Sequence, residues 1–229
     1  MAQTGISPGP SSREHSAPGL ERAARTRGLN PLGALAYVRH VGGAEAIAQV
    51  LGRLREDDLV LLGAAGDITG RRLTATSWVP FKLQVRLLRA IDQSLGEGDL
   101  STLFEVGRFM GSRDVPRVFR PFLRLGNPGW IMSLSTRLWR YYHDRGRWEL
   151  SRSPVSVLAT LFDHPESDEA FCATFMGWLT GALEVSGGVD VRVDHPVCHA
   201  RGGSKCVFTA RWAVSPEATS PGRKRAPDE

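Results

Sequence analysis

The chain has 229 residues, of which 41% are hydrophobic and 23% charged, an ordinary composition for one soluble globular domain with a single core. Its formal net charge of +5 is modest for this length, which argues against nucleic acid as the main partner. No apolar segment approaches the ~18 residues that span a bilayer, so we expect no membrane association.

Both ends of the chain lack apolar periodicity. Residues 1–33 and 214–229 are rich in Pro, Ser, Gly, Ala and Arg, so we predict two disordered tails around one folded domain at 34–213. In the first tail a basic cluster of Arg22, Arg25 and Arg27 could contact acidic partners, although a solvated tail is the simpler interpretation. The chain has no hydrophobic signal peptide and has three cysteines, an odd number, so we expect a cytoplasmic protein.

Apolar spacing predicts helices throughout the first two thirds of the folded part. Pro80 suits the first turn of a helix and Gly96 its end, while Asp99 is a good N-cap for the next one. Residues 57–67 are ambiguous. The predicted helices run over 44–54, from Pro80 to Gly96, from Asp99 past Met110, over 118–125 after Pro116, and from Asn127 to about His143.

The last third combines strands with one further helix. Residues 168–186 have apolar side chains at helical spacing, and Gly187 ends that helix. A turn around Gly202 makes the last two strands a hairpin. Four strands are predicted, over 148–150, 155–162, 189–193 and 206–212. The expected fold class is therefore α+β, with helices packed on one side of a roughly four-stranded antiparallel sheet.

All three cysteines lie in this last third. Cys172 falls in the first turn of the helix, and Cys198 and Cys206 lie on the hairpin. Folding the hairpin about Gly202 places Cys198 opposite Cys206, with Cβ atoms ~4.5–5.5 Å apart. The two thiols are then close enough to share a ligand or to bond to each other.

His195 is the fourth candidate ligand. Strict alternation would point it to the opposite sheet face from Cys198, but Pro196 can break the ladder and turn it back. Three thiolates and one imidazole would complete a tetrahedral zinc site of the structural kind. We predict such a site at Cys172, His195, Cys198 and Cys206. The alternatives are a Cys198–Cys206 disulfide and three buried free thiols.

These motifs resemble a known family. A helical cysteine, a Gly-x3-Gly pair at 177–181, Cys198, and Gly-x3-Cys-x-Phe at 202–208 together resemble the C-terminal signature of 4-vinyl reductase domains. Such domains also form the sensory part of bacterial regulators that respond to phenols and related aromatics. They are related to heme-NO-binding domains and to TRAPP subunits. The specific motif covers only the C-terminal stretch.

The resemblance implies a set of ligands and a cofactor. In the aromatic-sensing members the corresponding positions bind a structural zinc, so it would make Cys172, Cys198 and Cys206 ligands. His195 stands where the family usually has Glu. The heme-binding branch uses an axial His with a Tyr-x-Ser-x-Arg motif, which this chain lacks, leaving His40 and His143 as isolated histidines. We therefore expect structural zinc as the cofactor and heme to be unlikely.

The aromatic residues of the helical half could line a cavity for a small hydrophobic or aromatic ligand, although aromatic stripes at helical spacing are more often core. The candidates are Trp78, Phe81, Phe119, Phe122, Trp130, Trp139, Tyr141, Tyr142 and Trp148. The resemblance to ligand-binding domains is the main support for a pocket.

No catalytic motif is evident: the chain has no phosphate-binding Gly-rich loop, no His-Glu-x-x-His and no Gly-x-Ser-x-Gly. Asp163-His164 is a polar pair of the kind that usually caps or turns the chain. We favour a stand-alone, non-catalytic sensory module that acts through a homodimer or a protein partner. The alternatives are an adaptor of the same fold and an accessory subunit of a reductase.

Overall fold

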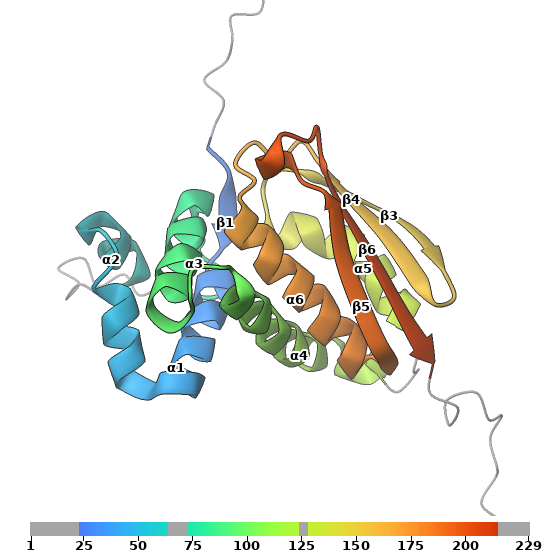
Figure 1. The fold of residues 1–229 in the computed structure, drawn as a ribbon, viewed down its shortest axis with the longest axis horizontal. Helices are drawn as coiled ribbons and strands as arrows, with labels where there is room; N and C mark the ends of the chain where they lie inside the picture. The colour runs from blue at the N-terminus through green and yellow to red at the C-terminus, as the bar shows by residue number, and fades with distance from the viewer. Residues whose placement is uncertain (1–22, 64–72, 124–127, 215–229) are drawn as a thin grey trace, which may run out of the picture.

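The computed structural model describes residues 23–63, 73–123 and 128–214, with side chains described except at 115–131, 134 and 214. Within these ranges, helices gather on one side of the molecule and a four-stranded antiparallel sheet lies on the other (Figure 1). The α+β class predicted from the sequence is confirmed. None of the described helices combines the length and the apolar composition that crossing a membrane requires.

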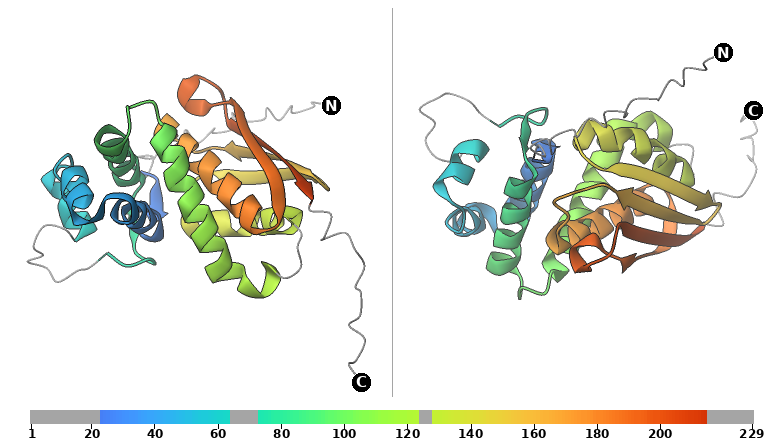
Figure 2. Two further views of the ribbon diagram at one scale, coloured as in Figure 1. Left: turned by 60° about the horizontal axis from the view of Figure 1, so that its bottom comes forward. Right: turned by 90° about the horizontal axis from the view of Figure 1, so that it is seen from above.

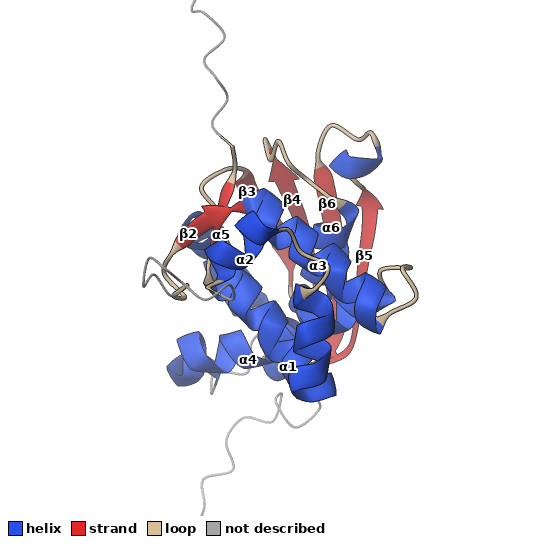
Figure 3. Cartoon of the chain, turned by 90° about the vertical axis from the view of Figure 1, so that its left-hand side faces the viewer, coloured by secondary structure: helices blue, strands red, loops and turns tan. Residues whose placement is uncertain are grey.

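The N-terminal part is built from three helices, α1 (Leu29–Leu51), α2 (Glu56–Leu62) and α3 (Phe81–Leu95). Figure 3 views the molecule from this side. α1 bends at Gly43, whose φ of 63° is a conformation that glycine adopts without steric cost. The predicted helix over 44–54 is thus the second half of α1. Pro80, predicted in the first turn of a helix, is the N-cap residue directly before α3.

A small two-stranded sheet fastens this helical part to the rest of the molecule. β1 (Arg25–Arg27) pairs antiparallel with β2 (Trp78–Pro80). Thr26 of β1 also forms an isolated bridge with His143, directly after α5 (Pro128–Tyr142). The N-terminal strand therefore lies beside the end of α5.

Two long helices, α4 (Ser101–Leu123) and α6 (Glu169–Val185), cross in the middle of the molecule (Figure 1). They touch through glycines on both sides. A Cβ atom added at Gly107 would lie 1.8 Å from the carbonyl oxygen of Thr174, and one at Gly177 would lie 1.8 Å from that of Phe104. Only glycine allows the two backbones to approach this closely.

The main sheet has the strand order β3-β4-β6-β5, and all neighbours are antiparallel. Its strands are β3 (Arg147–Ser153), β4 (Ser156–Phe162), β5 (Gly188–Val197) and β6 (Cys206–Val214). α5 and α6 pack on one face (Figure 2). Exposed apolar side chains such as Leu158 and Val189 belong to strands of this sheet.

The described residues form two main hydrophobic cores. One lies between the sheet and the helices α5 and α6, and includes Trp139, Trp148 and Phe208. The other lies among α1, α3 and α4, and includes Val38 and Leu103. Trp178 of α6 packs against both cores. The boundary between the cores therefore runs along α6.

The structured part of the chain begins earlier than the tail predicted to end at residue 33. Ala24 is fully buried, and β1 and the start of α1 follow it. The arginines predicted to be solvated make internal contacts: Arg25 pairs with Asp144 at 2.7 Å, and the Arg27 guanidinium lies 3.9 Å from the Trp78 ring centroid. Arg22 and the remaining tail residues, 1–22 and 215–229, lie outside the described residues.

The helix predicted to restart after Pro116 does not exist as a separate element. α4 continues through Pro116 to Leu123. A proline removes one intrahelical hydrogen bond, but the preceding turns of α4 are held against α6 along their length. The helix predicted to be capped by Asp99 begins two residues later, at Ser101, and the Asp99 carboxylate accepts a hydrogen bond from the Ser101 N–H at 3.0 Å.

Candidate functional site

The four residues predicted as metal ligands lie together between α6 and the last hairpin. The Sγ atoms of the three cysteines and a ring nitrogen of His195 all lie within 4.8 Å of one another. Cys172 Sγ is 3.8 Å from Cys206 Sγ and 4.0 Å from Cys198 Sγ. A tetrahedral metal–thiolate centre with bonds of ~2.3 Å has S–S edges of ~3.8 Å. The spacing of the sulfurs therefore suits a metal ion, and all three thiols are free rather than joined in a disulfide.

A β-bulge brings His195 into this cluster. Val197 pairs with Val207 but Asp194 pairs with Thr209, so the register of β5 shifts by one residue between them. His195 and Pro196 lie within that shift, which is the irregularity that Pro196 led us to expect. The His195 ring stacks on Phe208 with centroids 4.2 Å apart, and its buried Nε2 has no hydrogen-bond partner.

Within the cluster, the thiols of Cys172 and Cys206 have pKa values shifted in opposite directions. A hydrogen bond to Cys206, followed by burial, raises the pKa of Cys172 far above its ordinary value. The pKa of Cys206 is lowered chiefly by the hydrogen bond from the Cys172 thiol, and further by the His195 imidazole and the His199 backbone N–H. The Cys206 thiol therefore loses its proton more readily than the Cys172 thiol, and the thiolate is the form that binds metals.

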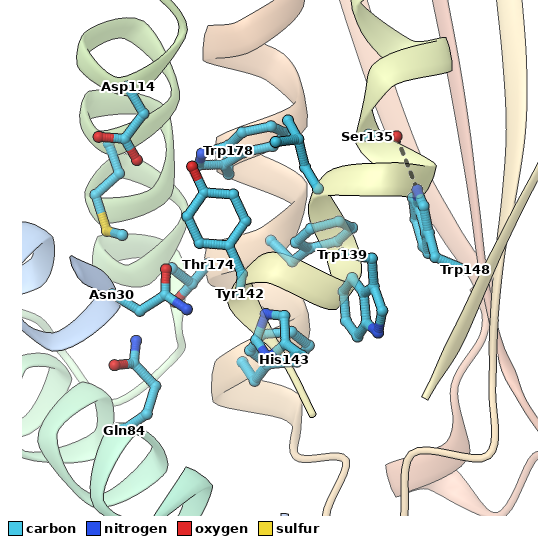
Figure 4. Close-up of a pocket in the computed structure, with 14 residues that line it drawn as sticks. Asn30, Gln84, Asp114, Ser135, Trp139, Tyr142, His143, Trp148, Thr174 and Trp178 are labelled. Carbon is cyan, nitrogen blue, oxygen red and sulfur yellow. Dashed lines mark hydrogen bonds between the residues drawn. The ribbon is translucent and has the colours of Figure 1, made fainter. Parts of the chain in front are cut away.

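A pocket with aromatic walls lies where the two cores meet (Figure 4). It is bounded by α4, α5, α6 and β3, with contributions from α1 and α3. The space between its atoms, mouth included, is about 650 Å³, of which about 70 Å³ is free for the centre of a water-sized sphere. Its apolar lining consists of Met110, Leu138, Trp139, Tyr142, Trp148, Phe171, Phe175 and Trp178.

Two polar atoms in this lining are buried without a hydrogen-bond partner. They are Oε1 of Gln84 and Nδ1 of His143, which come from α3 and from the residue after α5. Other polar groups of the lining are already engaged: Ser135 Oγ accepts from Trp148 Nε1 at 2.9 Å (Figure 4). Because buried polar groups are almost always paired, these two are the ones that a ligand could satisfy.

Two side chains that line the pocket, His143 and Tyr142, have pKa values shifted from their ordinary values. Burial, followed by the neighbouring His164, lowers the pKa of His143 well below its ordinary value, so the imidazole is neutral. Burial and the carboxylate of Asp114 raise the pKa of Tyr142 to about 12. His143 stacks on Trp139 with centroids 4.2 Å apart, which fixes the imidazole plane against an apolar wall. A neutral imidazole of this kind can accept a hydrogen bond or bind a metal.

The sequence identified only part of this pocket. Trp139, Tyr142 and Trp148 line it as predicted, whereas Tyr141 is 46% exposed and Phe81 lies in the core. The side chains of Phe119, Phe122 and Trp130 lie outside the described side chains. Gln84, Phe171 and Thr174 also line the pocket and were not predicted from the sequence. No signal in the sequence distinguishes them from other core positions.

Comparison with protein-family models finds no match, and comparison with curated proteins finds none either. The resemblance to 4-vinyl reductase domains is therefore not shown beyond its motif.

Several solved structures share the fold. An H-NOX protein from S. oneidensis in the Fe(II)NO ligation state has 13% identity and a TM-score of 0.57, covering 82% of this chain and 99% of its own. An unliganded Fe(II) H-NOX mutant from K. algicida has 11% identity and a TM-score of 0.59, covering 83% and 98%. A third structure, concerned with heme redox potential and porphyrin distortion, has 12% identity and a TM-score of 0.52, covering 81% and 99%. The chain thus shares the fold of these H-NOX structures.

These comparisons correct the cofactor prediction. Structural zinc was expected and heme was not, yet the solved structures with this fold include iron-ligated and heme proteins. The expectation failed because it relied on a heme-binding motif of a few residues, whereas the likeness extends over most of the fold. Heme therefore becomes a candidate cofactor, and the cysteine–histidine cluster is a candidate metal site without an assigned ion.

Proposed function

We propose that this chain is a non-catalytic sensory module that binds a small apolar or aromatic molecule, or a prosthetic group, in the aromatic pocket. The observation that carries the proposal is the pairing of aromatic walls with two buried, partnerless polar atoms, on Gln84 and His143. Ligand sites are typically concave and apolar with a few polar anchors of this kind. The H-NOX-like fold, found in proteins with bound gaseous ligands, supports the same conclusion.

The pocket must widen to take a ligand of ordinary size. Its free volume of about 70 Å³ holds only a few water molecules, since one water needs roughly 10–15 Å³ by this measure. The walls come from helices of both cores, so widening would shift one core relative to the other. Binding would in this way change the arrangement of the helices, which is what a sensory module needs in order to signal.

Filling the pocket tests this proposal. Thr174 and Thr180 are both buried on α6, and each hydroxyl donates to the carbonyl four residues earlier, but only Thr174 lines the pocket. Thr174→Met should abolish stabilisation by pocket ligands, and Thr180→Met, the matched control, should retain it. The measurement is the shift in melting temperature with hemin and a panel of small aromatic compounds. A compound present at 100 Kd should raise the melting temperature by roughly 5–10 °C.

Equal shifts in the two variants would place binding elsewhere. If no compound in the panel stabilises the wild-type chain and a protein co-purifies with it instead, the adaptor function would be favoured. Co-purification with a reductase would favour the accessory-subunit alternative.

The chemistry of His143 favours heme as the group that binds in the pocket. His143 offers a buried, neutral imidazole whose Nδ1 lacks a partner, among aromatic side chains, and axial ligation requires such a group. The donor chemistry therefore fits heme, with His143 as the residue that would hold the iron. When bound, heme would supply an iron atom able to take a gaseous ligand. Trp139 would hold the imidazole in place by stacking.

Hemin titration of the purified chain tests this assignment. We expect a sharp Soret band at a one-to-one ratio in the wild type and its loss or shift in His143→Ala. His40→Ala is the control, because His40 stacks on Phe109 and is not part of the pocket lining. Free imidazole should restore the band of the alanine variant. An unchanged spectrum in His143→Ala would eliminate His143 as the axial ligand.

We also propose that Cys172, His195, Cys198 and Cys206 hold a metal ion. The support is their geometry, with four ligand atoms within 4.8 Å and the sulfurs at tetrahedral spacing. Such an ion would tie the first turn of α6 to the last hairpin. Signal output through a homodimer or a protein partner in the cytoplasm completes the proposal.

A further inference from the structure

The carboxamide of Gln84 lies in the wall of the aromatic pocket without any hydrogen bond to the described part of the chain. Gln84 belongs to α3, is 3% exposed and lines the pocket. Its Oε1 atom is buried and has no partner. Figure 4 shows this side chain on the α3 side of the pocket, opposite the aromatic side chains of α5. A buried carboxamide in this state is a group to which a ligand can bond.

Several other polar groups of the lining are already bonded within the protein. Asn30 Nδ2 donates to Thr26 Oγ1 at 2.6 Å, and the Thr174 hydroxyl donates to the carbonyl oxygen four residues earlier at 2.9 Å. The indole N–H groups of Trp139 and Trp148 also donate to protein oxygens. These donors are therefore committed to the fold, whereas the carboxamide on α3 is not.

The charge of the lining disfavours an anionic ligand. Among the lining residues that the structure describes there is no Lys or Arg. The carboxylate of Asp114 also lies in the lining, and it already has an interaction partner. An anionic group brought into this pocket would lose its hydration without gaining a cationic partner from the lining.

A carboxamide has a specific hydrogen-bonding pattern. It offers one acceptor, Oε1, and one donor, Nε2, side by side in one plane. A group that places an N–H beside a carbonyl or ring nitrogen can satisfy both atoms with two parallel hydrogen bonds, as adenine does with glutamine. Half a turn about the last side-chain torsion exchanges the oxygen and the nitrogen, so the edge can bind in either orientation.

The walls and the carboxamide together define a class of ligand. We propose that Gln84 makes the pocket selective for flat, uncharged heterocycles with a lactam edge, meaning a ring N–H beside a ring carbonyl. The aromatic side chains cover the faces of the ring, and the carboxamide bonds to its edge. This inference rests on the proposed function of the pocket and names the class of its small-molecule ligand.

A matched pair of compounds tests the proposal. 2-Quinolone and coumarin are flat bicyclic molecules that differ at one ring position, where the first has an N–H and the second an oxygen. Isothermal titration calorimetry with the full chain measures both affinities. We expect the wild type to bind 2-quinolone about tenfold more tightly, because coumarin has no N–H to donate to Oε1 of Gln84. Gln84→Met keeps an unbranched side chain without the amide, and should bind the two compounds with equal affinity.

Two further variants make the result specific. Gln93→Met replaces an exposed glutamine on the same helix and should keep the preference of the wild type. Thr174→Met, which fills the pocket, should bind neither compound. Melting curves verify that each variant is folded, and the comparison of the two compounds in the wild type does not depend on any variant.

The outcomes separate this inference from the proposed function. Binding of both compounds by the wild type with equal affinity would overturn the lactam selectivity and leave the pocket standing. Persistence of the preference in folded Gln84→Met would also overturn it, since the N–H would then be recognised by another group. Failure of the wild type to bind either compound would contradict the pocket and the selectivity together.

Discussion

His143 and Gln84 each have a buried polar atom without a partner, and such atoms cost ~1–3 kcal/mol of folding free energy apiece. Both lie in the same pocket, although they are far apart in the sequence. A fold tolerates this cost most readily where a bound group can satisfy the atoms. The individual residues thus support ligand binding independently of the likeness to known structures.

At the same scale, the cysteine–histidine cluster gives a prediction about metal content. Cys206→Ser and His195→Ala should each reduce the metal bound per chain, and Cys206→Ser should also destabilise the fold by more than ~2 kcal/mol, since metal binding energy contributes to folding. His195→Glu should retain the metal, because a carboxylate is also a sound ligand. Elemental mass spectrometry and denaturant unfolding measure the two effects.

Metal absent from the wild-type chain, or present equally in Cys206→Ser, would contradict the metal site. A count of reactive thiols before and after chelation provides an independent check, because thiols released from a metal become reactive.

The sequence located this cluster well and the pocket poorly. Pro196 predicted the irregularity that the register shift between Asp194 and Val197 contains, because a proline cannot donate to a ladder. Gln84 gave no such signal, since a glutamine on an amphipathic helix is ordinarily solvated. It is 3% exposed because α1, α4 and α6 pack against α3, and a local sequence pattern does not reveal that packing.

At the scale of elements, the crossing of α4 and α6 positions the pocket. Four glycines, at 107, 111, 177 and 181, bring the helices into backbone contact. Thr174, Phe175 and Trp178 then line the pocket from α6, while Met110 and Asp114 line it from α4. The distance between α4 and α6 where they cross therefore determines the width of the pocket.

Substitution at the crossing should be strongly destabilising. In Gly177→Ala the new methyl would lie 1.8 Å from the Phe104 carbonyl oxygen, so the helices must separate, and we expect a loss of ~3 kcal/mol. Gly52→Ala is the control, because its methyl would come no closer than 3.3 Å to another atom, and its stability should change little. Urea unfolding followed by circular dichroism measures both. Equal stability of the two variants would refute the close crossing.

The sequence predicted the four strands of the main sheet and most of the helices in order, but it missed β1, β2 and the first half of α1 and left the region of α2 ambiguous. The Gly-x3-Gly pair at 177–181 could be recognised in the sequence, whereas the surface of α4 that packs against it could not. The predicted break after Pro116 was wrong for the same reason, because the local cost of a proline is small beside the packing of a long helix.

The whole molecule consists of two cores with a pocket between them. Ala24 and β1 join the cores at one end, where the strand bridges to His143 beside the pocket. A ligand that widens the pocket would therefore push on the junction of the two cores. This architecture is shared with H-NOX structures at 11–13% identity.

The central claim is that the aromatic pocket binds a ligand, and native mass spectrometry of the chain purified from its own cells tests it most directly. We predict that the wild-type and Thr180→Met proteins carry a non-covalent added mass that is released on denaturation, and that Thr174→Met does not. The same added mass in all three proteins, or bare chains that neither hemin nor any aromatic compound stabilises, would contradict the account.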